Sequence, residues 1–200
     1  MDNVSAIIVA IGTVLTAVLS YFQYSKNKTT DFKIEQWKTN EKQKNVKRNS
    51  NISQIYGVLW RLLHNMHADR VFIIQPHPLV KNLYVSVSLE VHDNGVEEIK
   101  SDFQDCKAGD YASLVSNLSQ RDFLYYEHTY QIKDNKSRAL SARHGANTMF
   151  IKKLSDDKFD WIGSIVCEYL HDEKNITVDF GKKVLQQCAD EIQYILPEYE

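Results

Sequence analysis

The sequence predicts an α+β protein with an amino-terminal transmembrane helix, a basic linker and one folded domain. Three patterns support this prediction. A run of residues near the amino terminus carries no charge. In the remaining chain, apolar residues recur at helical spacing near both ends. The middle contains runs that alternate between apolar and polar residues or are rich in β-branched residues. We therefore divide the 200 residues into an anchor at 1–24, a juxtamembrane linker at 25–50 and a domain at 51–200.

The anchor is the uncharged run from Val4 to Tyr21. At about 1.5 Å per residue this run extends about 27 Å as a helix, close to the roughly 30 Å hydrocarbon core of a bilayer. A cleaved secretory signal and a buried soluble helix are the alternatives. The first would have basic residues ahead of a shorter apolar core, and the second would show a polar stripe. A single membrane-spanning helix fits better than either.

Small and hydroxyl-bearing residues share about one third of the circumference of this helix, at about 100° per residue. Lipid provides no hydrophobic force between helices, so small residues and hydroxyls are typical of helix contact faces in membranes. The alternative is that these hydroxyls bond back to their own helix. We expect self-association through Ser5, Gly12, Thr13, Thr16 and Ser20.

The linker is basic, with eight Lys or Arg residues against three Asp or Glu. Such segments are attracted to anionic lipid head groups. Lysines on one side of a span also favour the cytoplasmic side, which predicts a cytoplasmic domain. Nucleic acid is not an expected partner, because few aromatic residues interleave the charges and the domain is mildly acidic. The residues expected to contact lipid are Lys26, Lys28, Lys33 and Lys38.

The domain begins with an amphipathic helix over residues 53–66, followed by a β-branched strand from Arg70 to Gln75. A second strand follows over residues 83–91, where apolar and polar residues alternate. Strict alternation predicts one half-buried face. That face would contain Leu83, Val85, Val87, Leu89 and Val91.

The middle of the domain gives weaker signals. We expect a short helix at 110–118 capped by Asp110, an aromatic strand at 123–132 and a loop at 134–137, while 138–146 is ambiguous. Strands at 148–154 and 160–170 form a hairpin. Thr177 caps a final amphipathic helix. The first and last helices should pack together on one face of an antiparallel sheet.

No catalytic motif is present, so we do not expect an enzyme or a cofactor. His64 and His67 lie three residues apart, a spacing that can present two metal ligands. No acidic or cysteine partner lies near them in the sequence, so a metal site is not expected. The odd number of cysteines is compatible with a reducing compartment; they are Cys106, Cys167 and Cys188.

The run HNMHADRVFIIQPHP follows an amphipathic helix, and the run FDWIGSIVCEYL is followed by another helix. The first run is similar to the entry into the first strand of GAF-type domains, and the second is similar to the end of that family. This resemblance covers about 145 residues. It implies a sheet flanked by amino- and carboxyl-terminal helices, and a module that binds a small ligand or a protein.

The chain has a single span near the amino terminus, a charged linker and an α/β domain. The last strand of this domain contains Trp161, Gly163, Ser164 and Ile165, and its last helix contains the Cys188–Ala189 pair. This layout and these motifs resemble the T-even phage holins. This resemblance implies self-association in the bacterial inner membrane and lesions at host cell lysis. It also implies a periplasmic domain that receives a protein regulator, whereas the lysines predict a cytoplasmic one.

The sequence therefore supports two functions. The first is a phage-type holin that oligomerises to form membrane lesions, timed by its soluble domain. The alternative is a membrane-anchored, GAF-like sensory or regulatory module that binds a small ligand or a protein partner.

Overall fold

The computed structural model describes the backbone of residues 2–78, 83–171 and 176–199. Within the long first helix, it does not describe the side chains of residues 2–15, 17–19, 25, 27 and 29–32. The chain forms two compact units, Met1–Asn49 and Ser50–Glu200. Because these units are separate bodies, each is described by itself.

The first unit consists of the amino-terminal part of helix α1, which spans Asp2–Met66. Nearly all of its described side chains are exposed, including Tyr21, Phe22 and Tyr24. The expected span, residues 4–21, falls mostly on side chains outside the described set. Within the part of the chain that the structure describes, no helix is both long enough and apolar enough to cross a membrane.

The second unit contains one antiparallel sheet of six strands, in the order β3-β2-β1-β6-β5-β4. The first and last long strands, β1 and β6, lie side by side in its centre, paired from Arg70 with Glu168 to Ile74 with Ser164. The expected hairpin of β5 and β6 is confirmed. The strands are β1 (Arg70–His77), β2 (Tyr84–His92), β3 (Cys106–Lys107), β4 (Phe123–Tyr126), β5 (Thr148–Ser155) and β6 (Trp161–Tyr169).

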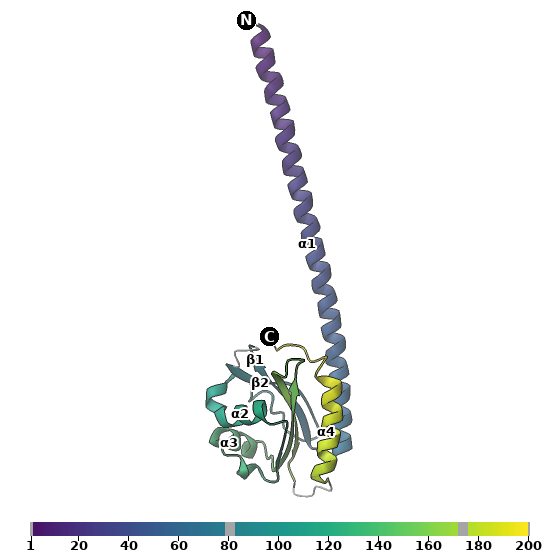
Figure 1. The fold of residues 1–200 in the computed structure, drawn as a ribbon, viewed down its shortest axis with the longest axis vertical. Helices are drawn as coiled ribbons and strands as arrows, with labels where there is room; N and C mark the ends of the chain where they lie inside the picture. Colours follow the sequence, from purple (N-terminus) through teal and green to yellow (C-terminus); the bar gives the residue numbers. More distant parts are fainter. Residues whose placement is uncertain (1, 79–82, 172–175, 200) are drawn as a thin grey trace. The chain divides into compact units, whose positions relative to one another are not determined.

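Helices cover both faces of this sheet (Figure 1). The end of α1 and the final helix α4 (Val178–Ile192) lie on one face, whereas α2 (Ala112–Gln120) and α3 (Asn135–Arg143) lie on the other. Two short 3-10 helices, η1 (Ala108–Tyr111) and η2 (Thr129–Gln131), connect the elements of the second face. The expected packing of the two terminal helices on a common face is confirmed.

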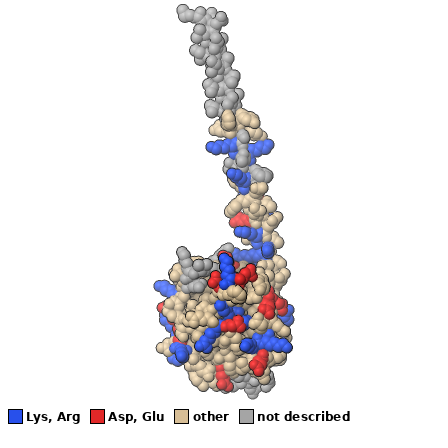
Figure 2. All heavy atoms as spheres, viewed as in Figure 1, with Lys and Arg blue, Asp and Glu red and all other residues tan. Residues whose placement is uncertain are grey.

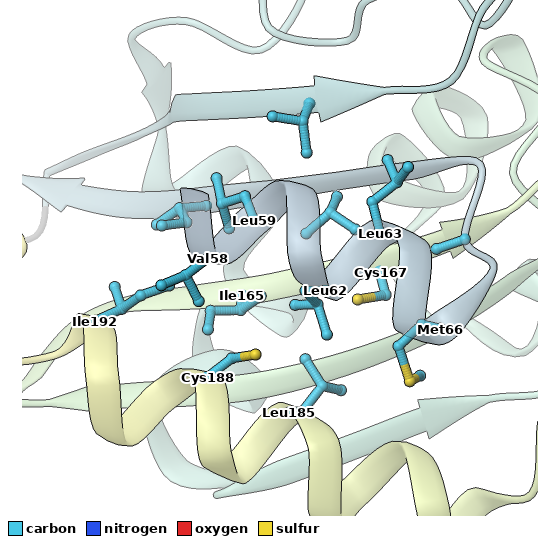
Figure 3. Close-up of a cluster of buried hydrophobic side chains, with 14 of the residues drawn as sticks. Val58, Leu59, Leu62, Leu63, Met66, Ile165, Cys167, Leu185, Cys188 and Ile192 are labelled. Carbon is cyan, nitrogen blue, oxygen red and sulfur yellow. The ribbon is translucent and has the colours of Figure 1, made fainter. Parts of the chain in front are cut away.

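The core on the α1–α4 side is apolar. Figure 3 shows side chains of α1, such as Leu62, and of α4, such as Leu185, pointing toward Ile165 and Cys167 of β6. All four of these side chains are fully buried. As expected, Thr177 caps α4, because its hydroxyl accepts a hydrogen bond from the amide of Phe180 at 3.3 Å. This face accounts for the amphipathic patterns at both ends of the domain.

The prediction that five residues of β2 share one face is wrong. Ile73 of β1 pairs with Leu89, but its neighbour Ile74 pairs with Val87, so Ser88 is an extra residue in β2. Such a bulge shifts the alternation by one residue. Leu89 and Val91 therefore pack in the α1–α4 core, Val85 and Val87 pack on the opposite face, and Leu83 is exposed.

Three local predictions in the middle of the domain are also wrong. Asp110 does not cap a helix; it lies inside η1, and α2 starts without a side-chain cap. The aromatic strand ends at Tyr126, followed by η2 rather than by more strand. The expected loop at 134–137 is the start of α3, where the carboxylate of Asp134 accepts the amide of Ser137 at 2.9 Å.

Candidate functional site

A cavity of about 40 Å³ lies between the sheet and the helices α2 and α3. Its floor is formed by side chains of five strands, β1, β2, β4, β5 and β6, and its roof by residues of α2, α3 and the segments next to them. Almost all of the lining is aliphatic or aromatic, as is usual for small-molecule pockets. The lining residues are Phe72, Ile74, Val87, Ile99, Phe103, Leu114, Tyr126, Ile132, Ser137, Leu140, Ser141, Met149, Ile151, Val166 and Glu168.

One charged residue, Glu168, lines this apolar cavity. Its side chain is fully buried and pairs with Arg70, its cross-strand neighbour, which is also fully buried. The Nε and Nη2 atoms of Arg70 both donate to Oε2 of Glu168, the Nε bond measuring 2.8 Å. The Nη1 atom of Arg70 donates to the backbone carbonyl of Glu97 at 2.7 Å. The guanidinium thus fixes the carboxylate through a single oxygen.

The other carboxylate oxygen of Glu168, Oε1, has no hydrogen-bond partner among the described residues. Neither has the hydroxyl of Ser137, a buried residue of α3 that lines the same cavity. Burial raises the pKa of the Glu168 carboxyl above its ordinary value, against the opposing effect of Arg70. An unpaired buried acceptor is costly, so these two atoms mark a place that a hydrogen-bonding group would occupy favourably.

A chain of polar contacts connects this pair to the surface. The Nη2 atom of Arg70 also approaches the carbonyl of His144, at 3.5 Å, and the Nε2 atom of the buried His144 ring lies 3.0 Å from Oδ2 of Asp102. Asp102 in turn pairs with the exposed Arg143 at 3.1 Å. A change in the hydrogen bonding of Glu168 can therefore affect the position of the loop between β2 and β3, because contiguous contacts connect the two.

The roof of the cavity is less firmly anchored than its floor. Helix α2 has a single buried residue, Leu118, and the buried residues of α3 are two serines, Ser137 and Ser141. Leu114 and Leu140, the apolar contributions of these helices to the cavity, are only partly buried. Segments with few buried apolar contacts open at low free-energy cost, so the roof is the side that can move.

A second polar cluster joins β1, β2 and the residue that precedes β3. The Nε2 atom of His77 lies 2.9 Å from the hydroxyl of Ser86 and 3.4 Å from a carboxylate oxygen of Asp105. In a Ser-His-Asp triad these two groups would contact different ring nitrogens. Here both contact the same nitrogen, and Ser86 is fully buried, so this geometry is not a catalytic triad.

The association residues expected from the sequence lie in the first unit. Thr16 and Ser20 are exposed on α1, while the side chains of Ser5, Gly12 and Thr13 lie outside the described residues. The lysines expected to contact lipid are also exposed on α1: Lys26, Lys28, Lys33 and Lys38. Figure 2 shows the basic side chains that follow one another along this segment. Neither set belongs to the cavity of the second unit.

Residues that carried the holin resemblance have structural roles in the second unit. The indole nitrogen of Trp161 donates to the hydroxyl of Ser164 at 3.0 Å, and both side chains are buried. A side chain on Gly163 would approach the carbonyl of Ile74 at 3.0 Å. Cys188 and Ala189 pack in the α1–α4 core. Core packing explains this pattern without a role in lysis.

His64 lies in the last turn of α1, and His67 follows the end of that helix. The Nδ1 atom of His64 lies 2.7 Å from the carbonyl of Trp60, and His67 has a positive φ of 47°. Across the described part of the chain, no group of three or more His, Cys, Asp or Glu residues is placed to hold a metal ion. The three cysteines are free thiols.

Sequence reasoning did not identify the cavity residues Glu168 and Ser137. A signal was nevertheless present, because Glu168 interrupts the apolar run of β6 and Arg70 opens that of β1. Charged residues inside buried strands are rare unless they are paired. Two such residues in separate strands indicate a buried pair, although the sequence does not show that they are neighbours.

No protein-family model and no curated protein matches the chain. Solved structures do match, among them a Synechocystis GAF domain in its photoproduct state, at 10% identity and a TM-score of 0.58, covering 70% of this chain and 89% of that one. A domain of a putative two-component sensor histidine kinase from Sinorhizobium meliloti matches at 11% identity and a TM-score of 0.52, covering 70% and 86%.

A phycoerythrobilin-bound GAF domain of a cyanobacterial phytochrome matches at 12% identity and a TM-score of 0.53, covering 74% of this chain and 94% of that one. At such low identity these likenesses show the fold alone, and the second unit has a GAF-like fold. The predicted GAF-like architecture is therefore confirmed. The likenesses give no support to the holin resemblance.

Proposed function

We propose that this protein is a membrane-anchored sensory or regulatory module that binds a small ligand between its sheet and the helices α2 and α3. The observation that carries the proposal is the cavity itself, whose apolar walls contain the two unpaired polar atoms Oε1 of Glu168 and Oγ of Ser137. Natural proteins seldom leave such atoms buried without a reason. The GAF-like fold, which sensor proteins also use, supports the same function.

The anchor in this proposal is the uncharged run from Val4 to Tyr21. Its length matches a bilayer core, and the basic segment that follows is suited to anionic head groups. The lysine distribution favours a cytoplasmic domain. The small-residue face of the run suits self-association, so ligand binding would be reported through a homo-oligomer or to a protein regulator of the domain.

Lesion formation, the other function considered from the sequence, has no observation in its favour among the described residues. The second unit has a cavity on one side of its sheet and an apolar core on the other. A ligand-binding module uses that cavity, whereas a protein that only breaches membranes does not require it. The sensory function is thus the better supported of the two.

To test this proposal, saturation-transfer NMR measures whether the full chain in lipid nanodiscs binds benzene, toluene or phenol. We expect at least one probe to bind. Leu114→Trp adds volume at the partly buried roof and should abolish binding. Leu83→Trp is the matched control at an exposed position outside the cavity and should leave binding unchanged.

The wild-type chain and both variants are measured in nanodiscs of the same lipid. The signal from probe that partitions into the lipid is therefore equal in all three samples. Equal signals from the wild-type chain and Leu114→Trp would mean that the cavity binds nothing. That result would overturn the proposed function.

A further inference from the structure

We infer that the ligand is a small, mostly apolar and uncharged molecule with one hydrogen-bond donor, and that this donor binds Oε1 of Glu168. The inference rests on the proposed function, because it assigns the chemistry of the ligand in the same cavity. It depends on which atoms in the cavity are already paired and which are not.

The polar end of the ligand must be a donor. Arg70 donates twice to Oε2 of Glu168, whereas Oε1 has no partner within the described part of the chain and belongs to a residue that lines the cavity. A carboxylate oxygen is only an acceptor. An O–H or N–H group at this point would form a charge-assisted hydrogen bond, which is stronger than one between neutral groups. The unpaired hydroxyl of Ser137 can add a second bond.

The ligand must also be uncharged. The guanidinium of Arg70 already neutralises Glu168, and both side chains are fully buried. A cationic ligand would place a second positive charge beside that guanidinium, where repulsion is poorly screened. An anionic ligand would face the Glu168 carboxylate, while the donors of Arg70 are directed to Glu168 and to the carbonyls of Glu97 and His144.

The body of the ligand must be apolar, because the remaining walls are mostly aliphatic and aromatic. The cavity of about 40 Å³ has room for roughly three waters at 10–15 Å³ each. A benzene-sized ring occupies a cavity of about 150 Å³ in a well-studied case, so a ring enters only if the cavity widens. The roof can provide this movement, since α2 and α3 bury only Leu118 and two serines.

Phenol, toluene and benzylammonium separate these requirements in one experiment. All three have a benzene ring, but phenol carries a neutral donor, toluene carries none and benzylammonium carries a charged one. With the full chain in nanodiscs, we expect phenol to bind about tenfold more tightly than toluene, as one charge-assisted hydrogen bond predicts. We expect benzylammonium to bind more weakly than phenol.

Two variants test whether the donor of phenol binds Glu168. Glu168→Gln can keep an oxygen toward Arg70 while it presents a neutral amide donor to the cavity, and it should reduce the preference for phenol over toluene, because the charge-assisted bond is lost. A second variant covers the case that this buried change prevents folding. Ser137→Ala removes only a hydroxyl, and it should weaken the binding of phenol several-fold and leave the binding of toluene unchanged. Ser116→Ala, at an exposed position of α2, is the matched control and should change neither.

The outcomes distinguish this inference from the proposed function. Toluene binding as tightly as phenol, or benzylammonium binding more tightly, would overturn the inferred chemistry and leave a ligand-binding cavity. A phenol preference that is undiminished in both cavity variants would also overturn it. Failure of all three probes to bind would mean that the cavity holds water only, and both the inference and the proposed function would fall.

Discussion

The two faces of the central sheet are built differently. On the α1–α4 face, helices bury aliphatic residues and Cys188 against the strands, and the charged exception, Lys152, pairs with Asp122 at the edge. On the α2–α3 face, the helix α3 buries serines, and the strands bury Arg70 and Glu168. One face is an ordinary hydrophobic core, and the other combines a core with a mostly apolar cavity that a buried ion pair borders.

This difference indicates that one face mainly stabilises the domain and that the other is adapted to binding. Burying aliphatic side chains stabilises the fold directly, whereas a buried ion pair with an unpaired oxygen recovers little of its desolvation cost. Sequences tend to depart from good packing at functional sites. The α1–α4 face is therefore the part that holds the domain together, and the α2–α3 face is the part adapted to a ligand.

The largest expected effect comes from the same substitution in the buried ion pair of the α2–α3 face and in an exposed ion pair between α1 and α4. Arg70→Met leaves the buried Glu168 carboxylate without its partner, and we expect it to lower the free energy of unfolding by about 3–5 kcal/mol. Arg61→Met breaks a pair with Glu191 whose side chains are about half exposed, and it should cost about 1 kcal/mol or less. Denaturant unfolding of the full chain in detergent measures both. Equal losses would contradict the burial of the Arg70–Glu168 pair.

A second comparison tests the packing of the α1–α4 face through two glycines. A Cβ atom at Gly181 of α4 would lie 2.7 Å from the ring of the fully buried Phe150. Gly181→Ala should therefore destabilise the chain by about 1–3 kcal/mol, despite the better helix propensity of alanine. Nothing lies within 4 Å of the same position at Gly57.

Gly57→Ala should instead stabilise the chain by up to about 1 kcal/mol, because alanine favours helix and meets no neighbour. Thermal unfolding of the two variants beside the wild-type chain distinguishes the signs. Stabilisation by Gly181→Ala would show that α4 packs less closely on β5 than the structure indicates.

The smallest effect concerns thiol reactivity. Burial raises the pKa of Cys167 well above its ordinary value and that of Cys188 to about 11, so little thiolate forms at pH 8. Both residues are in the α1–α4 core, while Cys106 is partly buried near the other face. We expect iodoacetamide to modify Cys106 first. Labelling of all three in denaturant is the control, and equal native rates would contradict this protection.

Much of the α1–α4 face was predictable from the sequence. The apolar spacing of Leu59, Leu62 and Met66 follows the helical period, and Thr177 is a capping residue at the start of a similar pattern. The hairpin of β5 and β6 followed from two β-branched runs and a short turn. These signals are local, so a single sequence contains them.

The α2–α3 face was not predictable in the same way. The bulge at Ser88 moves Val87 and Leu89 to opposite faces, yet the alternation in β2 gives no sign of it. The cavity depends on Arg70 and Glu168, which are 98 positions apart and meet because β1 pairs with β6. Long-range pairing and a single extra residue in a strand are properties of the folded chain rather than of local patterns.

Amide hydrogen exchange of the full chain in nanodiscs, with and without phenol, tests the account most directly. We expect amides of α2 and α3 to exchange faster than those of α4 and of residues 55–66, because their helices bury fewer apolar side chains. Phenol should slow exchange in α2, α3 and β6 and leave α4 unchanged. Uniform protection of both faces, or slowing confined to the α1–α4 face, would contradict the division into a structural face and a ligand-binding face.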